Sequence, residues 1–265
     1  MSRLWLVTSN DRKLLPCVLA ASELGTSALA AQAPGVIGAA LFTAGSEVLT
    51  LKRPVEVGHR LEAVIGENVR STRLLACLDE RDGVPFRSED VQPFRHKGWV
   101  MAITGDEPPE VTRDEHEDAF IRRNRRGHSP QEALFNLLVS RVYRQAAQTQ
   151  RPLAPKALAD MVREVLGRIQ PEAFGSWTLS LTCESIGIVM TRGRPVSWRT
   201  IERVRRCARC SDDAASMSRD ASVVGHQHLR ATVVVDGIDV PGPGWNRLED
   251  GQALVVEAEP PGRVV

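Results

Sequence analysis

The chain has 265 residues, of which 42% are hydrophobic and 25% charged, a composition typical of a globular protein with a sizeable core. Lys and Arg number 34 against 33 Asp and Glu, so the formal net charge is +1. This balance argues against a general nucleic-acid binder, whose affinity comes from many Lys and Arg contacts to phosphate. No apolar run approaches the ~20 residues that cross a bilayer. We therefore expect neither nucleic acid nor a membrane as partner, and a cytoplasmic location.

The first half of the chain predicts mostly strands. Short apolar runs bounded by turn residues indicate strands, and an Ala- and Leu-rich stretch that ends at Pro34 indicates a helix. Two of the apolar runs flank a connection that contains Gly45, which is the pattern of a β-hairpin. The expected elements are a strand at 4–8, a helix at 18–33, a hairpin of 38–42 with 47–51, and strands at 61–68 and 97–103.

The second half predicts a helix pair followed by strands. Ser129, Pro130 and Glu132 form a helix start, with Ser at the N-cap, Pro at the first helical position and Glu at the third. That helix runs to about 148, and a second one follows Pro155. After Pro171 the apolar pattern changes to period two. The expected strands are 177–182, 187–191, 228–235 and 253–258.

The order of elements predicts a single α+β domain over residues 1–258, with helices packed on antiparallel sheets. The segment 203–222 is basic and then rich in Ser and Asp, which indicates an exposed loop. Residues 259–265 contain two prolines and a glycine and are expected to form a tail.

Several short motifs carry a resemblance to a known family. They are Met1-Ser2-Arg3-Leu4, Asn68-Val69-Arg70, Asp90-Val91-Gln92-Pro93-Phe94, the strand from Trp99 to Thr104-Gly105, and Gly127-His128-Ser129-Pro130-Gln131-Glu132. In order and spacing they resemble the motifs of class II glutamine amidotransferases, which are N-terminal-nucleophile hydrolases, and most closely the small stand-alone forms. The resemblance covers nearly the whole chain and implies a four-layer αββα sandwich.

The resemblance also implies a site. In such enzymes a cysteine at residue two becomes the N-terminus when Met is removed, and its thiolate attacks the side-chain amide of glutamine with its own α-amine as the base. The nucleophile position here is Ser2. Thr104 and Gly105 stand where the family has the Asn and Gly that stabilise the oxyanion, and Arg70 stands where an arginine holds the glutamine carboxylate. Pro130 replaces the aspartate that holds the glutamine ammonium.

These replacements support two hypotheses and leave enzymatic activity open. The preferred one is a degenerate glutamine site in a non-catalytic binding, regulatory or scaffold protein, with a protein partner or a small carboxylate ligand bound through Arg70. The alternative is a Ser-type amidohydrolase in which Ser2 attacks an amide other than glutamine, with Thr104 and Gly105 at the oxyanion. Ser2 could also be merely a small residue that begins a strand, and Arg70 the partner of a structural acid. The oligomeric state is not predicted.

A second candidate site contains cysteines. Cys207 and Cys210 form a Cys-x-x-Cys pair, and His226 and His228 follow in the sequence, so zinc is one interpretation. A single such pair is a weak signal, and reduced thiols without a metal are the preferred interpretation. No phosphate-binding loop and no Gly-x-Gly-x-x-Gly motif occurs in the sequence. We therefore predict no metal and no cofactor.

Overall fold

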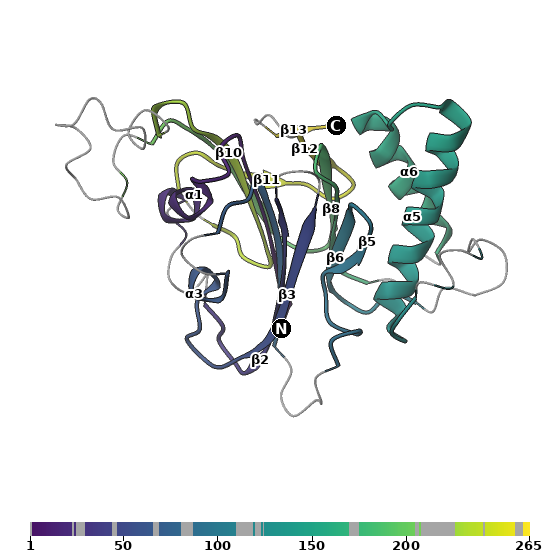
Figure 1. Cartoon of the computed structure of the whole chain (residues 1–265), viewed down its shortest axis with the longest axis horizontal. Helices are drawn as coiled ribbons and strands as arrows, with labels where there is room; N and C mark the ends of the chain where they lie inside the picture. Colours follow the sequence, from purple (N-terminus) through teal and green to yellow (C-terminus); the bar gives the residue numbers. More distant parts are fainter. Residues whose placement is uncertain are drawn as a thin grey trace.

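Two antiparallel sheets face each other in a computed structural model of the chain (Figure 1). The residues that the structure describes are 2–22, 24, 30–43, 47–65, 69–80, 87–109, 119, 123, 125–169, 175–204, 207, 226–240, 242–257 and 262–265. Within these ranges, no helix is long and apolar enough to cross a membrane.

The larger sheet has seven strands, and each neighbouring pair is antiparallel. Its strands, in spatial order, are β11 (Trp245–Leu248), β9 (Val196–Glu202), β10 (Arg230–Asp236), β1 (Ser2–Ser9), β4 (Arg73–Asp79), β2 (Gly35–Phe42) and β3 (Val48–Val55). The first described residues therefore lie on a central strand, with β10 on one side and β4 on the other.

The smaller sheet has six strands and is also antiparallel throughout. Its order is β13 (Arg263–Val264), β12 (Ala253–Glu257), β8 (Ile186–Arg192), β7 (Trp177–Thr182), β6 (Trp99–Gly105) and β5 (Phe94–His96). The helices are α1 (Leu15–Ala21), α3 (Leu61–Ile65), α5 (Pro130–Thr149) and α6 (Pro155–Arg168).

The helices cover the outer faces of the two sheets. Helices α1 and α3 lie against the seven-stranded sheet, and α5 and α6 against the six-stranded sheet (Figure 1). The expected α+β fold, a four-layer αββα sandwich, is confirmed. The helix start at Ser129 is also confirmed, because its hydroxyl oxygen accepts a hydrogen bond from the backbone N–H of Glu132.

Burial on both faces explains the apolar sequence of the central strands. In β1, Trp5 and Val7 pack on the helix side, while Leu4 and Leu6 pack between the sheets. All four are fully buried. Each such side chain contributes roughly 1.5–3 kcal/mol relative to exposure, so β1 is anchored firmly and with it the position of residue 2.

Two sequence expectations for elements were wrong. The helix expected at 18–33 is shorter and earlier, because Pro16 opens α1 in its first turn and α1 ends at Ala21. Residues 61–68 were expected as a strand, but 61–65 form helix α3. Leu61, Val64 and Ile65 have helical spacing, and all three are buried in the core beneath α1.

Two surface segments also differ from expectation. The end of the expected tail is part of the smaller sheet, because Arg263–Val264 pairs with β12 and Val265 exchanges backbone hydrogen bonds with Ala253. The segment 203–222 was expected to be exposed, but Val204 and Cys207 within it are buried. Val204 continues the β9–β10 ladder by donating its N–H to the carbonyl of His226. Residues 205–206, 208–222 and 259–261 lie outside the described residues.

Candidate functional site

The start of β1 meets the end of β6. The backbone N–H of Gly105 donates a hydrogen bond to Ser2 Oγ over 3.1 Å. Gly105 has φ +101°, and a Cβ at this position would lie 2.2 Å from the carbonyl oxygen of Ser176. Only glycine fits this turn. The structure therefore brings Ser2 and Gly105 together, as the sequence predicts.

A small pocket of about 230 Å³ opens beside Ser2. Its lining consists of one hydroxyl, two carboxylates, two carboxamides, one apolar side chain and the glycine. These residues are Ser2, Asp79, Gln92, Ile103, Gly105, Asp106 and Gln131. None of the described residues that line the pocket is basic. Asp106 also holds the neighbouring strand, since its Oδ2 accepts the backbone N–H of Ser176 at 2.7 Å.

Gln92 fixes one wall of the pocket. Its side-chain amide donates to the carbonyl of Ile103 at 2.7 Å, and its Oε1 accepts the N–H of the same residue at 2.5 Å. Gly38 on β2 permits this arrangement, because a Cβ there would lie 1.7 Å from the backbone carbonyl oxygen of Gln92. The carboxamide thus extends the hydrogen bonding of β6 just before Gly105.

The first turn of α5 supplies the opposite wall through Gln131. Two hydrogen bonds to the Glu132 carboxylate, from the N–H groups of Arg126 at 3.0 Å and Gly127 at 2.7 Å, hold the approach to the helix. Asp90 accepts the N–H of His128 at 3.0 Å. These contacts hold the segment that leads into α5, and the Ser129 cap satisfies the Glu132 N–H, a backbone donor that a helix start leaves open.

A buried ion pair lies directly beneath Ser2. The fully buried Asp236 accepts hydrogen bonds from Arg194 Nε and Nη2, both at 3.0 Å, and Arg194 Nη2 also donates to the backbone carbonyl of Ser2 at 3.0 Å. Thr178 donates to Asp236 at 2.7 Å, and the Thr104 hydroxyl donates to the same carboxylate. Thr104 is only 2% exposed. Its hydroxyl donates to Asp236, and Thr104 is not among the described residues that line the pocket.

The structure places Arg70 far from Ser2. In the pairing of β1 with β4, Ser2 lies opposite Asp79 and Thr8 opposite Arg73. Arg70 precedes Arg73 and is exposed. The length of β4 alone puts it about 20 Å from Ser2. The motif with Arg70 was matched to the segment before β4, whereas the strand position next to Ser2 holds Asp79. A carboxylate ligand bound through Arg70 therefore cannot occupy this pocket.

A larger hollow of about 450 Å³ lies on the other side of the α5 start, between β3 and β5. Its described lining contains cationic side chains, namely Lys52, Arg95 and Arg126. Burial lowers the pKa of Lys52, and the nearby Glu132 carboxylate partly opposes this shift.

Four residues at or beneath the Ser2 pocket were not predicted from the sequence: Asp79, Asp106, Arg194 and Asp236. Asp79 and Asp236 each end an apolar strand, and this is the signal that could have identified them. Among the cysteine candidates, Cys207 and His226 are buried, His228 is exposed, and Cys210 lies outside the described residues.

The architecture is a four-layer αββα sandwich, and solved structures that share this fold include proteins described as glutamine amidotransferases. One is a predicted glutamine amidotransferase from Pseudomonas aeruginosa (TM-score 0.57, 13% identity, 97% of this chain and 96% of that one). Another is a glutamine aminotransferase class-II domain protein from Silicibacter pomeroyi (0.56, 15%, 99% and 98%). A third is glutamine phosphoribosylpyrophosphate amidotransferase from Bacillus subtilis (0.55, 15%, 99% and 48%).

These identities establish the shared fold and nothing finer. No protein-family model matches the sequence, and no curated protein matches it significantly.

Proposed function

We propose that this chain is a glutamine amidotransferase-like protein with a degenerate glutamine site, and that it acts as a non-catalytic binding protein in a regulatory or scaffold role. The observation that carries the proposal is the charge of the Ser2 pocket: the described residues that line it include Asp79 and Asp106 and no basic side chain. Among these described residues, the α-carboxylate of glutamine would meet no cation. A lost charged hydrogen bond costs roughly 1.5–3 kcal/mol, or about one to two decades in affinity.

The surroundings of Ser2 support the same conclusion. The Gly105 N–H, which would be the remaining oxyanion donor, donates to Ser2 Oγ itself. The Thr104 hydroxyl is engaged by Asp236. Pro130 stands at the start of α5 and offers no carboxylate to accept hydrogen bonds from an ammonium group. The pocket thus favours a neutral or cationic small ligand over an amino-acid carboxylate.

The alternative function is a Ser-type amidohydrolase that acts on a different amide. The observation in its favour is that Ser2 lines the pocket and lies 3.1 Å from a backbone N–H. It requires removal of Met1, because only then is the α-amine of Ser2 available as a base. Met1 lies outside the described residues. The substrate would carry a neutral or positive group toward Asp79 and Asp106.

The test combines intact mass, glutamine hydrolysis and covalent labelling of the untagged protein. We expect no glutamine hydrolysis that depends on Ser2, so Ser2→Ala should behave as the wild type does. We also expect no labelling of Ser2 by a serine-directed acylating probe. Ser185→Ala, on an exposed turn, is the matched control. Hydrolysis of glutamine that is lost in Ser2→Ala but kept in Ser185→Ala overturns the proposal. Labelling at Ser2 without glutamine hydrolysis, in protein that lacks Met1, replaces it with the alternative. The cytoplasmic location remains a prediction.

A further inference from the structure

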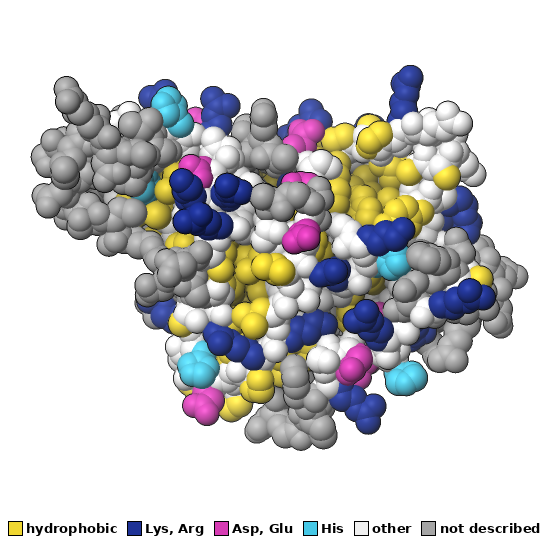
Figure 2. All heavy atoms as spheres, in the orientation of Figure 1, with side chains coloured by type: hydrophobic (Ala, Val, Ile, Leu, Met, Phe, Trp, Pro, Cys, Tyr) yellow, Lys and Arg dark blue, Asp and Glu magenta, His cyan; other side chains and the backbone are white. Residues whose placement is uncertain are grey.

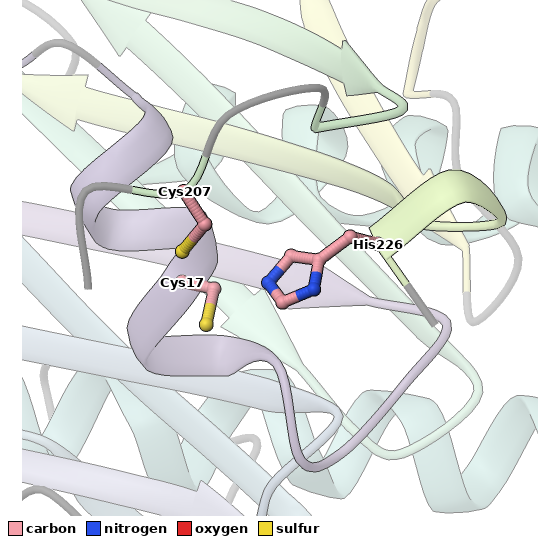
Figure 3. Close-up of side chains that lie close together, drawn as sticks. All are labelled: Cys17, Cys207 and His226. Atoms are coloured by element: carbon pink, nitrogen blue, oxygen red, sulfur yellow. The ribbon is translucent and has the colours of Figure 1, made fainter. Parts of the chain in front are cut away.

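A cluster of two cysteines and one histidine lies in the core between α1 and the seven-stranded sheet (Figure 3). Cys17 comes from α1, Cys207 follows β9, and His226 precedes β10. The two sulfur atoms and a ring nitrogen all lie within 4.8 Å of one another. Their exposed fractions are only 3%, 4% and 4%. Three segments far apart in the sequence thus deliver three metal-ligating side chains to one point.

The local structure explains why the three side chains converge. The N–H of Arg203 donates to the carbonyl of Leu229 at 2.9 Å, and that of Val204 to His226 at 3.0 Å. These bonds continue the β9–β10 pairing and place the segments of Cys207 and His226 side by side. Helix α1 covers them, and Arg199 of β9 donates to the carbonyl of Ser22 just after α1 at 3.4 Å.

We propose that Cys17, Cys207 and His226 bind a zinc ion. Tetrahedral zinc with Zn–S bonds of about 2.3 Å and a Zn–N bond of about 2.0 Å spaces its ligand atoms roughly 3.5–3.8 Å apart. A contraction of at most about 1.3 Å brings the observed cluster to that spacing. Sulfur and imidazole without a carboxylate select zinc over magnesium or calcium. Two thiolates and a neutral imidazole also balance the dipositive ion, so the site is neutral overall and its burial is tolerated.

The candidate site consists of three residues that the structure describes. Exposed His228 is not part of the cluster. The site lies at the opposite end of β1 from Ser2, because Ser9 pairs with Ala231 close to His226. Zinc there would join α1 to the ends of β9 and β10 and stabilise the fold without taking part in the Ser2 pocket.

The first test is the metal content of the full chain purified without chelators. We expect close to one zinc per chain, lost in Cys17→Ala, Cys207→Ala and His226→Ala. Two matched controls, Cys77→Ala in the layer between the sheets and Cys183→Ala near β7, should keep it. Absence of zinc in the wild type, together with failure of the metal-free protein to bind added zinc, overturns the proposal. So does equal loss of zinc in the controls.

A second measurement on the wild type covers the case in which the variants fail to fold. Cobalt added to the metal-free protein should give thiolate-to-metal charge-transfer bands and the visible bands of tetrahedral cobalt. One equivalent of zinc should abolish these bands and raise the melting temperature. Absence of thiolate bands overturns the site. A Cys17–Cys207 disulfide, found by thiol alkylation and intact mass without reductant, also overturns it.

Discussion

The two ends of the layer between the sheets are built differently. At the end near Ser2, Asp236 of the larger sheet bonds to Thr104 and Thr178 of the smaller one, and Arg194 neutralises its charge. At the other end, Arg73 of the larger sheet donates to the Thr182 hydroxyl at 2.8 Å and to the carbonyl of Val256 at 3.0 Å. Its pKa is lowered to about 10, chiefly by burial, with the Cys183 and Glu184 side chains opposing the shift.

The two ends differ in what their charged groups hold. The Asp236–Arg194 ion pair also holds the backbone of Ser2, because Arg194 donates to the Ser2 carbonyl. Arg73 is bonded to hydroxyl and carbonyl oxygen atoms inside the molecule and is 1% exposed, so it joins the sheets without facing a ligand. On the face drawn in Figure 2, Lys and Arg side chains are spread over the surface, with acidic side chains between them.

The largest effect is expected at the Ser2 end. Asp236→Ala leaves the Arg194 guanidinium and two threonine hydroxyls without their common acceptor, and removal of one member of a buried ion pair costs about 3–5 kcal/mol. Urea unfolding followed by circular dichroism measures the loss. Asp236→Asn should lose less, since it keeps an acceptor, and exposed Asp239→Ala should lose almost nothing. A change below about 1 kcal/mol in Asp236→Ala would show that the ion pair does not hold this end together.

The expected effect of Arg73→Met at the other end is smaller. The variant loses the hydrogen bonds to Thr182, Cys183 and Val256, each worth about 0.5–1.5 kcal/mol, but it also removes a charge that burial penalises. We expect a net loss of about 1–3 kcal/mol in the free energy of unfolding. Arg247→Met on exposed β11 is the control. A larger loss of unfolding free energy in Arg73→Met than in Asp236→Ala would show that the fold depends more on the Arg73 end than on the Ser2 end.

The sequence predicted the layers better than the contacts. The hairpin of β2 and β3, the cap at Ser129 and the paired strands β7 and β8 depend on local patterns, and local patterns are visible in one sequence. The family resemblance added the αββα architecture and the proximity of Ser2 to Gly105.

The positions of the individual site residues depend on strand register, which local sequence patterns do not fix. Residues 99–103 are apolar on both faces of β6, so their period does not tell which way the Thr104 side chain points. Arg70 was placed by a short motif match, and pairing of β1 with β4 puts Asp79 there instead. Cys17 had no partner signal at all, because its neighbours Cys207 and His226 are distant in the sequence and only packing of α1 unites them.

A moderate effect is expected where α5 begins beside the Ser2 pocket. Ser129→Ala removes the acceptor for the Glu132 N–H, and loss of such a cap costs about 1 kcal/mol. Ser129→Asp should restore most of the stability, because a carboxylate also caps a helix. Urea unfolding of both variants, with Ser185→Ala as control, checks this prediction. Equal stabilities of Ser129→Ala and the wild type would mean that the Glu132 carboxylate alone fixes the helix start.

The smallest effect is expected near the Arg73 end, at His96 of β5. Burial lowers the pKa of His96, and the charge of Lys97 adds to the shift; the ring lies edge-on to Tyr143, with centroids 5.8 Å apart. Because the pKa in the folded state is below the ordinary value of ~6.5, the unfolded chain binds more protons between the two values. Stability therefore falls as the pH falls through ~6.5 toward the folded-state pKa.

The wild type should lose more stability than His96→Asn when urea unfolding at pH 5 is compared with pH 7. His128→Asn, which changes an exposed histidine, should behave as the wild type does. Equal losses in wild type and His96→Asn would show that His96 is protonated as easily in the folded chain as in the unfolded one, and that burial in β5 does not penalise a charged imidazole.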